Sequence, residues 1–191
     1  MIINEEDVVF KCYSDGSSYN NGYKNPDLPQ FASCGVVITL NGKILKKGAK
    51  LFKDQTISYG ELKGSILVLD LLEKRILSKH PEITKPYHVE LYSDSQFVVN
   101  SINEWMYNWL KKCKDWRTDV WYNSSGKVVG QYELFREIKL RYLDNPDWDI
   151  KYIHVKGHTK SKDFNSRMND LCDTLAKGKT DAYRKELGLD K

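Results

Sequence analysis

Residues 8–17 read Val-Val-Phe-Lys-Cys-Tyr-Ser-Asp-Gly-Ser, and this stretch decides the fold. Its first seven residues, Val8–Ser14, are mostly β-prone and predict a central strand that is apolar on both faces. Asp15 follows that strand directly and precedes a glycine. A carboxylate at the carboxyl end of a strand lies where α/β folds place their sites. The stretch therefore predicts a central strand and a candidate functional acid together.

Three further acids occupy comparable positions. Asp94 ends the strand-like run Leu-Tyr-Ser-Asp at residues 91–94, Glu61 opens an apolar helical stretch, and Asp173 lies in a later helix. Two strand ends and two helices can bring these acids together, and clustered carboxylates raise one another's pKa unless cations neutralise them. Oxygen-only ligand sets suit Mg²⁺ or Mn²⁺, and paired ions of this kind promote phosphodiester hydrolysis. The first hypothesis is therefore a metal-dependent nuclease.

Hydrophobic periodicity predicts one α/β domain with the element order βββαβααβα. A second strand is predicted at Cys34–Leu40. Asn41-Gly42 follows it and is a strong hairpin signal, so the chain is expected to return as a third strand that ends at about Lys53. Two further strands are predicted at Val89–Ser93 and Asp149–Val155. Four helices are predicted: from near Ser58 to before Pro81, from Ser95 to about Cys113, about Tyr132–Leu143, and about Ser166–Lys177.

Composition sets broad limits on function. A length of 191 residues suits one well-buried domain, and the net charge of +4 permits a polyanionic partner without requiring one. The four cysteines show no metal-binding spacing, and Cys12 and Cys172 fall in apolar patterns, which predicts reduced core thiols. The N-terminal residues lack the features of a signal peptide, and no run is long enough to span a membrane. We therefore expect a cytoplasmic protein without a membrane partner.

Each acid also has an ordinary structural explanation. Asp15 and Asp94 could be turn residues, since Asp is common before Gly or Ser at strand ends. Glu61 could be a first-turn acid that favours the helix dipole, or the partner of Ser58 in a Ser-x-x-Glu capping box. Asp173 could be a solvated helix acid, although it falls off the apolar stripe of its helix.

All four acids, in this order and at these separations, resemble the type 1 ribonuclease H family over almost the entire chain. The matching fragments are Asp15-Gly-Ser, Gly-Glu61-Leu, Asp94-Ser-Gln, Val155-Lys-Gly-His158, and then Asn169 and Cys172-Asp-Thr-Leu-Ala. The resemblance implies the ribonuclease H-like fold, a five-stranded mixed sheet flanked by helices. It further implies a catalytic domain over residues 1–180, followed by a charged C-terminal tail over residues 181–191.

The same resemblance implies the activity. An endonuclease of this family hydrolyses the RNA strand of RNA–DNA hybrids by a two-metal-ion mechanism and leaves 5′-phosphate and 3′-hydroxyl ends. Asp15, Glu61, Asp94 and Asp173 would be catalytic ligands of two Mg²⁺ ions, with Mn²⁺ as a substitute. His158 would shuttle a proton or assist product release, unless it is a loop histidine without a function. The family typically acts as a monomer, with no obligate protein partner.

Contacts to the substrate are also implied by resemblance. Gly16 and Gln96 match positions that contact 2′-hydroxyl groups, the feature that distinguishes RNA from DNA, and Ser17 is a further expected substrate-binding residue. Two neighbouring amides expected before the second acid are replaced by Ile57 and Ser58. A pocket that some relatives use for a DNA-strand phosphate keeps Thr56, with Gln131 in place of the usual Asn.

The middle of the chain is similar to the basic protrusion of bacterial members. The residues that carry this similarity are Ser95-Gln-Phe-Val98, Trp105, Asn108, Trp109, Lys111, Lys112 and Trp116, and Lys114 and Arg117 belong to the same basic cluster. Basic side chains interleaved with aromatic ones suit a nucleic-acid backbone, although such runs are more often simply solvated. Trp105, four residues before Trp109, is expected to face the core.

Two other functions remain open at this point. Ile57 and Ser58 leave room for a nuclease or strand-transfer enzyme of the same fold with a broader range of nucleic-acid substrates. A catalytically silent module that only binds nucleic acid or protein is the second alternative. The loss of an acid would be the signature of such a module, and all four acids are present.

Overall fold

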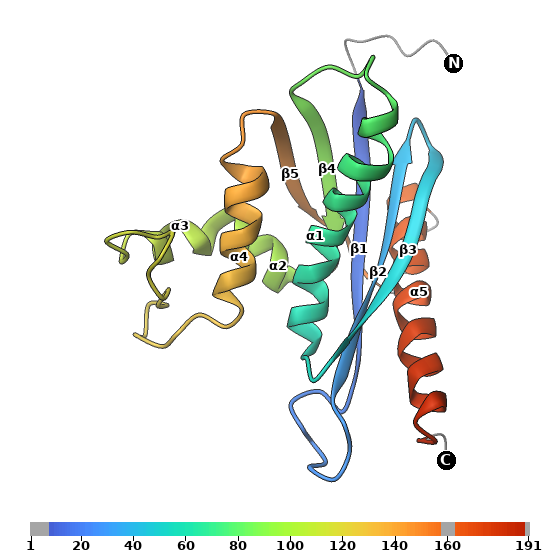
Figure 1. The fold of residues 1–191 in the computed structure, drawn as a ribbon, viewed down its shortest axis with the longest axis vertical. Coiled ribbons are helices and arrows are strands. Elements are labelled where there is room, and N and C mark those ends of the chain that lie inside the picture. The colour runs from blue at the N-terminus through green and yellow to red at the C-terminus, as the bar shows by residue number, and fades with distance from the viewer. Residues whose placement is uncertain (1–7, 158–162, 190–191) are drawn as a thin grey trace.

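The computed structural model describes residues 8–157 and 163–189, and a five-stranded sheet forms its centre (Figure 1). The strands, given in chain order, are β1 (Val9–Tyr19), β2 (Phe31–Leu40), β3 (Lys43–Lys53), β4 (Tyr87–Ser93) and β5 (Trp148–His154). Their order across the sheet is β3-β2-β1-β4-β5. The first three strands pair antiparallel, whereas β4 pairs parallel with β1 and with β5. The predicted mixed sheet is confirmed.

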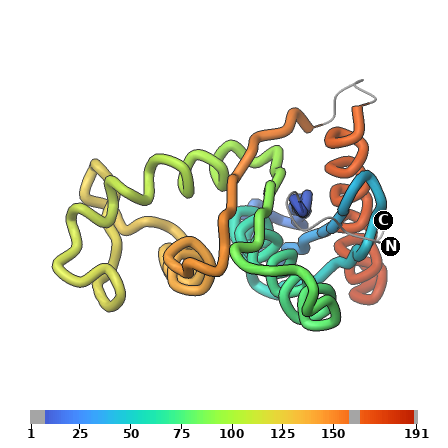
Figure 2. The backbone as a smooth tube through the Cα atoms, turned by 90° about the horizontal axis from the view of Figure 1, so that it is seen from above, coloured from blue at the N-terminus to red at the C-terminus, as the bar shows by residue number. Residues whose placement is uncertain are grey.

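Helices cover both faces of this sheet. They are α1 (Ile57–Arg75), the 3₁₀ turn η2 (Leu77–Lys79), α2 (Gln96–Asn100), the π-helical turn η3 (Ser101–Trp105), α3 (Met106–Leu110), α4 (Tyr132–Ile138), the π-helical turn η4 (Lys139–Leu143) and α5 (Phe164–Glu186). α1 lies on one side of the sheet with α4 beside it, and α5 lies on the other (Figures 1 and 2). The chain between α2 and α4 extends away from the sheet (Figure 2).

The hairpin between β2 and β3 forms as the sequence predicts. Asn41 has a φ of 50° and Gly42 a φ of 73°. Two successive left-handed residues are the requirement of a type I′ turn, whose twist matches that of the flanking strands. The turn pairs β3 with β2, and β3 lies at one edge of the sheet.

Two groups of buried apolar side chains hold the layers together. The larger group lies on the α1 side of the sheet and includes Phe10, Leu62, Leu69 and Trp121, each fully buried. The smaller one lies under α5 and consists of Tyr13, Val37, Tyr92, Val155 and Cys172. Burying this much apolar surface is the main favourable contribution to folding.

α5 lies in direct backbone contact with β2. A Cβ atom on Gly35 of β2 would overlap the carbonyl oxygen of Cys172 and would lie 2.9 Å from the backbone nitrogen of Ala176. Close to this contact, the hydroxyl of Ser33 donates to the carbonyl oxygen of Ala176 at 2.7 Å. Only a residue without a side chain allows this approach, so Gly35 sets how near α5 lies to the sheet.

α5 continues nine residues beyond the predicted end near Lys177, to Glu186. The reason is tertiary packing: the ring of Tyr183 lies edge-on against Phe31, with 4.9 Å between the ring centroids. The ammonium group of Lys53 lies 5.0 Å from the centroid of the Tyr183 ring. These contacts stabilise a last helical segment that its charged sequence alone does not favour. The predicted domain boundary after residue 180 stays a prediction.

The four cysteines are free thiols. Cys12, Cys34 and Cys172 are buried, and burial raises the pKa of each of these thiols. The prediction of reduced core thiols at Cys12 and Cys172 agrees with this. Among the helices of the described residues, none combines the length and the apolar composition needed to cross a bilayer.

Candidate active site

Two of the four acids are brought together by the parallel pairing of β1 with β4. Tyr13 lies opposite Tyr92 at the last paired position of these strands. Beyond it, β4 ends at Ser93, whereas β1 continues along β2 to Tyr19. The prediction that the first strand ends at Ser14 is therefore wrong: Asp15 lies inside β1, because pairing with Gly35 of β2 extends the strand. Asp15 and Asp94 each stand two residues after the paired tyrosines, so both lie where the strands separate. Functional groups in α/β sheets gather at such a divergence of strands.

The other two acids reach this point from helices on opposite faces of the sheet. Glu61 lies in the second turn of α1, on the side that faces β1. Asp173 follows Cys172 on α5, whose backbone contacts Gly35 of β2. Gly35 is in turn the β2 residue paired with Asp15. The fold therefore brings the four predicted acids near one another from β1, α1, α5 and the segment that follows β4, close enough for the other three to act on Asp15.

Among the four acids, Asp15 lies in the environment that is least favourable to a negative charge. Only 7% of the residue is exposed, and this burial is the largest cause that raises the pKa of Asp15, to about 8. The charge of Asp94 raises the pKa further, and Asp173 and Glu61 add to this effect. The N–H of Gly16 donates to Oδ1 of Asp15 at 2.6 Å and acts in the opposite direction. A carboxyl group in this state needs a positive charge nearby to ionise readily.

Local donors hold three of the four carboxylates. Besides the Gly16–Asp15 bond, Oγ of Ser95 donates to Oε2 of Glu61 at 2.7 Å, and Nζ of Lys177 donates to Oδ2 of Asp173 at 2.7 Å. Burial raises the pKa of Glu61, while the Ser95 hydroxyl lowers it.

This arrangement fits a divalent cation in ligand type and charge but is not closed around one. Within residues 8–157 and 163–189, no three His, Cys, Asp or Glu side chains meet in a group ready to hold a metal ion. The four acids supply only oxygen, the donor that Mg²⁺ and Mn²⁺ prefer. Their mutual repulsion is the condition that such an ion relieves. At Asp173 a bound ion would compete with the ammonium group of Lys177 for the carboxylate.

Gly157 lies directly against Asp94. A Cβ atom on Gly157 would overlap Oδ2 of Asp94 and would lie 3.0 Å from its Cγ. The backbone at residue 157 therefore leaves no room for a side chain beside the Asp94 carboxylate. His158, the next residue and a predicted catalytic group, lies outside the described residues.

We expect the stability of the metal-free protein to fall as the pH rises. The pKa of the Asp15 carboxyl is 3.8 when unperturbed and about 8 in the fold. Below the lower value the group is neutral in both the folded and the unfolded state, and above the higher value the folded state carries the whole penalty of a buried charge. The difference in melting temperature between Asp15→Asn and the wild type, measured in chelator, should therefore grow from pH 5 to pH 8. A difference that stays constant over this range would contradict the assignment.

The structure removes the ordinary explanations for Glu61. Thr56 caps α1, since its Oγ1 accepts a hydrogen bond from the N–H of Tyr59 at 3.4 Å. Ser58 is therefore not the cap of a Ser-x-x-Glu box, and the first turn of α1 contains no acid. Asp173 is not a fully solvated helix acid either, because only 15% of its side chain is exposed.

Three residues make contacts at or near the site that the sequence analysis did not predict: Lys177, Ser95 and Asn21. Lys177 stands four residues after Asp173, a spacing that itself signals an ion pair on a helix. Ser95 caps α2 in addition to donating to Glu61. Asn21 accepts a hydrogen bond from the N–H of Ile57 at 2.9 Å through its Oδ1. No local signal predicts this last bond, because it joins a loop to a helix that begins 36 residues later in the chain.

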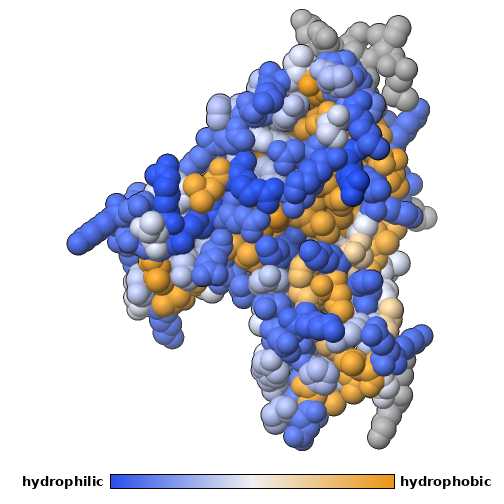
Figure 3. Space-filling model, viewed as in Figure 1, coloured by the Kyte–Doolittle hydropathy of each residue, from blue (hydrophilic) through white to orange (hydrophobic). Residues whose placement is uncertain are grey.

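The predicted substrate-binding residues fall into two groups. The first lies in β1 and at the starts of α1 and α2, and consists of Gly16, Ser17, Thr56, Ser58 and Gln96. The second lies on the protrusion, which we define as residues 106–131, and consists of Asn108, Trp109, Lys111, Lys112, Lys114, Trp116 and Gln131. Substrate contact by either group stays a prediction. In a space-filling view, the protrusion is mostly hydrophilic with small apolar patches (Figure 3).

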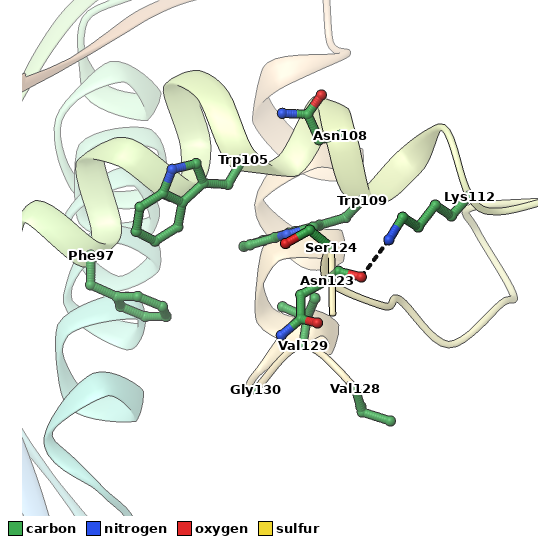
Figure 4. A pocket seen from close by; sticks show the side chains of 10 residues that line it. All are labelled: Phe97, Trp105, Asn108, Trp109, Lys112, Asn123, Ser124, Val128, Val129 and Gly130. Atoms are coloured by element: carbon green, nitrogen blue, oxygen red, sulfur yellow. Dashed lines mark hydrogen bonds between the residues drawn. The ribbon is translucent and has the colours of Figure 1, made fainter. Parts of the chain in front are cut away.

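A cavity of about 400 Å³ separates the helical part of the protrusion from its loop (Figure 4). Its walls contain Asn108, Trp109 and Lys112 from the helical side and residues 128–130 from the loop. The Lys112 ammonium donates to the carbonyl oxygen of Asn123 and ties the two sides together. Predicted contact residues thus line a polar and aromatic hollow.

The protrusion has cations over its aromatic rings. The guanidinium of Arg117 and the ammonium of Lys139 lie 4.7 Å and 4.9 Å from the ring centroid of Trp116. Lys111 and Lys114 are exposed. Gln131 begins α4 with a φ of 61°. The basic side chains are therefore available to solvent, whereas Trp116 is partly enclosed.

The prediction that Trp105 faces the core is wrong. Trp105 is 39% exposed, whereas Trp109 is only 7% exposed. The π-helical turn η3 ends at Trp105. Because a π-helical turn contains more residues than an α-helical turn, its side chains point in directions that differ from those of a regular α-helix. Trp105 consequently lines the cavity rather than the core.

Comparison with known proteins gives one consistent result. The RNase H family model matches residues 7–181. The Ribonuclease H of Clostridium botulinum strain Hall is 31% identical over 172 residues, which cover 90% of this chain and 95% of the relative.

Solved structures share the fold. The N-terminal RNase H domain of a Mycobacterium tuberculosis protein aligns with a TM-score of 0.60 at 18% identity, over 95% of this chain and 99% of that one. LC11-RNase H1, solved in complex with an RNA/DNA hybrid, aligns with a TM-score of 0.54 at 19% identity, over 89% and 98%. At these identities the structural likeness supports the fold alone.

Proposed function

Because the chain belongs to the ribonuclease H family, we propose that it is an endonuclease that hydrolyses the RNA strand of RNA–DNA hybrids and leaves 5′-phosphate and 3′-hydroxyl ends. The observation that carries this proposal is the convergence of Asp15, Glu61, Asp94 and Asp173 from four elements, with the pKa of Asp15 raised to about 8. A hybrid is the ligand of the structural neighbour LC11-RNase H1, which supports the choice of substrate.

The four carboxylates would hold two Mg²⁺ ions, for which Mn²⁺ could substitute. When bound, such ions supply an activated water and stabilise the charge that develops on the leaving oxygen. The chain's own contribution is to hold the oxygen ligands in place. Ser95 orients Glu61 through the hydroxyl bond of 2.7 Å, and the absence of a side chain at Gly157 lets the backbone lie against Asp94. His158 would move a proton or assist release of the product.

Discrimination of RNA from DNA would begin at the carboxylates. We propose that Gly16, Ser17 and Gln96 contact the ribose, since all three lie where β1 and β4 separate and are accessible there. Thr56 and Ser58 lie at the adjacent start of α1. Ile57 cannot donate through its side chain, so this chain has fewer amide donors at that helix start than the family pattern leads one to expect.

The protrusion would bind the nucleic-acid backbone beside the cleavage site. Replacing Lys111, Lys112 and Lys114 with Ala should weaken hybrid binding and reduce the slope of log K against log salt by up to about 3, or about 0.9 for each lost phosphate contact. The measurement is hybrid binding by anisotropy at several salt concentrations. A matched control replaces the exposed lysines 74, 79 and 151, which lie outside the protrusion, and should keep the slope. An unchanged slope in the first variant would mean that the protrusion lysines are only solvated.

The remaining expectations about the protein stay proposals. We propose a catalytic domain over residues 1–180 with a charged tail over 181–191, acting as a monomer in the cytoplasm without an obligate protein partner. Sedimentation at several concentrations would test the monomer.

A broader nuclease activity is the second candidate function, and the absence of amides at Ile57 and Ser58 favours it. The deciding experiment compares cleavage of labelled RNA–DNA hybrid, duplex RNA, duplex DNA and single strands with Mg²⁺, with Mn²⁺ and with chelator. Metal-dependent cleavage of RNA in the hybrid alone supports the leading proposal. Cleavage of other duplexes supports the broader nuclease. Tight binding to the hybrid without cleavage would overturn both and favour a silent binding module.

A further inference from the structure

One carboxylate of the site is already paired with a cation from the chain itself. Nζ of Lys177 lies 2.7 Å from Oδ2 of Asp173, one turn away on α5. The side chain of Asp173 is 15% exposed, whereas that of Lys177 is 55% exposed. The acid is thus fixed in a shielded position, and the flexible lysine can leave it for solvent without moving the helix.

Lys177 differs in charge from the other donors at the site. The N–H of Gly16 and the hydroxyl of Ser95 are neutral groups. Among residues 8–157 and 163–189, Lys177 alone places a full positive charge within hydrogen-bond distance of one of the four carboxylates. Its pKa is raised, chiefly by the hydrogen bond to Asp173, and the field of Asp15 also contributes. The Lys177 ammonium therefore interacts electrostatically with Asp15 as well as with its direct partner, Asp173.

We propose that Lys177 is an internal counter-charge that occupies Asp173 in the metal-free protein, so that a divalent cation gains this carboxylate only by displacing the lysine. The inference rests on the proposed function, because it takes the four carboxylates as a site for divalent cations. It identifies Lys177 as a positioning residue that acts through Asp173.

Two consequences follow from one competition. The lysine stabilises the protein when no cation is bound, because it offsets part of the repulsion among the acids. For the same reason it lowers the affinity of the site for a cation. A partly exposed ion pair changes an equilibrium by about two- to fivefold, which sets the expected size of both effects.

The test measures the binding of Mn²⁺ to the full chain in the absence of nucleic acid. Electron paramagnetic resonance of the free ion reports how much Mn²⁺ is bound. Lys177→Gln should bind Mn²⁺ about two- to fivefold more tightly than the wild type. Lys177→Arg keeps the charge and should restore the wild-type affinity. Lys179→Gln is the matched control: it removes an exposed lysine of the same helix with no hydrogen bond or ion pair to Asp173, and should leave the affinity near that of the wild type.

Thermal denaturation provides a second readout. In chelator, Lys177→Gln should melt below the wild type and below Lys179→Gln, and Mn²⁺ should raise its melting temperature by more than it raises theirs. In an Asp173→Asn background, Lys177→Gln should no longer change the Mn²⁺ affinity, because the carboxylate under competition is gone.

The outcomes separate this inference from the proposed function. If Lys177→Gln and Lys179→Gln both bind Mn²⁺ with the affinity of the wild type, the inference is overturned. If the wild type also cleaves the hybrid, the proposed function still holds. An equal gain in Lys177→Gln and Lys179→Gln would reduce the inference to a general effect of net charge and overturn it too. A wild type that binds no Mn²⁺ would overturn the metal assignment itself, and the inference with it.

Discussion

Asp15→Asn should lower cleavage of an RNA–DNA hybrid by more than about a hundredfold, the size of effect expected when a central ligand of catalytic ions is lost. Asp15 is the most buried of the four acids, and the charges of the other three all raise its pKa. Because the substitution leaves the lysines of the protrusion untouched, hybrid binding should stay close to that of the wild type. Single-turnover cleavage and binding anisotropy measure the two effects separately.

The same variant should be more stable than the wild type in chelator near pH 8. An amide has no charge to bury, so the penalty that raises the pKa of Asp15 disappears. Asp54→Asn, at an exposed position after β3, is the matched control and should change neither cleavage nor melting. Loss of cleavage together with higher stability would separate a chemical defect from unfolding. Substantial residual cleavage would instead sink the assignment of the site.

Gly35→Ala should destabilise the fold by about 2–3 kcal/mol or more, the usual cost of forcing extra atoms into a packed contact. The added Cβ would overlap the carbonyl oxygen of Cys172, and the backbone of α5 cannot rotate away as a side chain could. This energy corresponds to a fall in melting temperature of roughly 5–10 °C for a chain of this size. Thermal denaturation followed by circular dichroism measures it.

Gly178→Ala is the matched control for that substitution. Gly178 lies on the same helix, but no atom lies within 4 Å of the Cβ that alanine would add. Alanine is the better helix former by about 1 kcal/mol, so this variant should be as stable as the wild type or more stable. Gly35→Ala should also bind Mn²⁺ more weakly at temperatures where it is folded, because Asp173 follows Cys172 directly. An undisturbed melting temperature in Gly35→Ala would mean that α5 is free to shift.

The sequence predicted the elements whose signals are local. Alternating and continuous apolar runs identified all five strands, and Asn41-Gly42 identified the hairpin. The acids were recognisable because Asp15 and Asp94 follow β-prone runs and Glu61 and Asp173 lie at fixed places in helical patterns. Each of these signals depends on residues close together in the chain, so the tertiary structure was not needed to read them.

Other features depended on contacts between distant segments. The extension of α5 to Glu186 follows from the packing of Tyr183 on Phe31. The exposure of Trp105 follows from the π-helical turn before α3, which simple helical periodicity does not anticipate. The prediction for Trp105 is wrong because a periodic pattern assumes a regular helix. For the segment after Lys177 the sequence indicates at most a short frayed helix, because packing decides where a helix ends.

The sequence by itself determined which acids this protein has and which element carries each one. Only the tertiary structure decided their chemical state: how deeply Asp15 is buried, that Ser95 holds Glu61, and that Lys177 holds Asp173. The physical reason is that burial and electrostatic fields depend on distances of a few ångströms between groups far apart in the chain. A sequence pattern specifies residue types and local periodicity, and such distances exist only once the sheet has closed against α1 and α5.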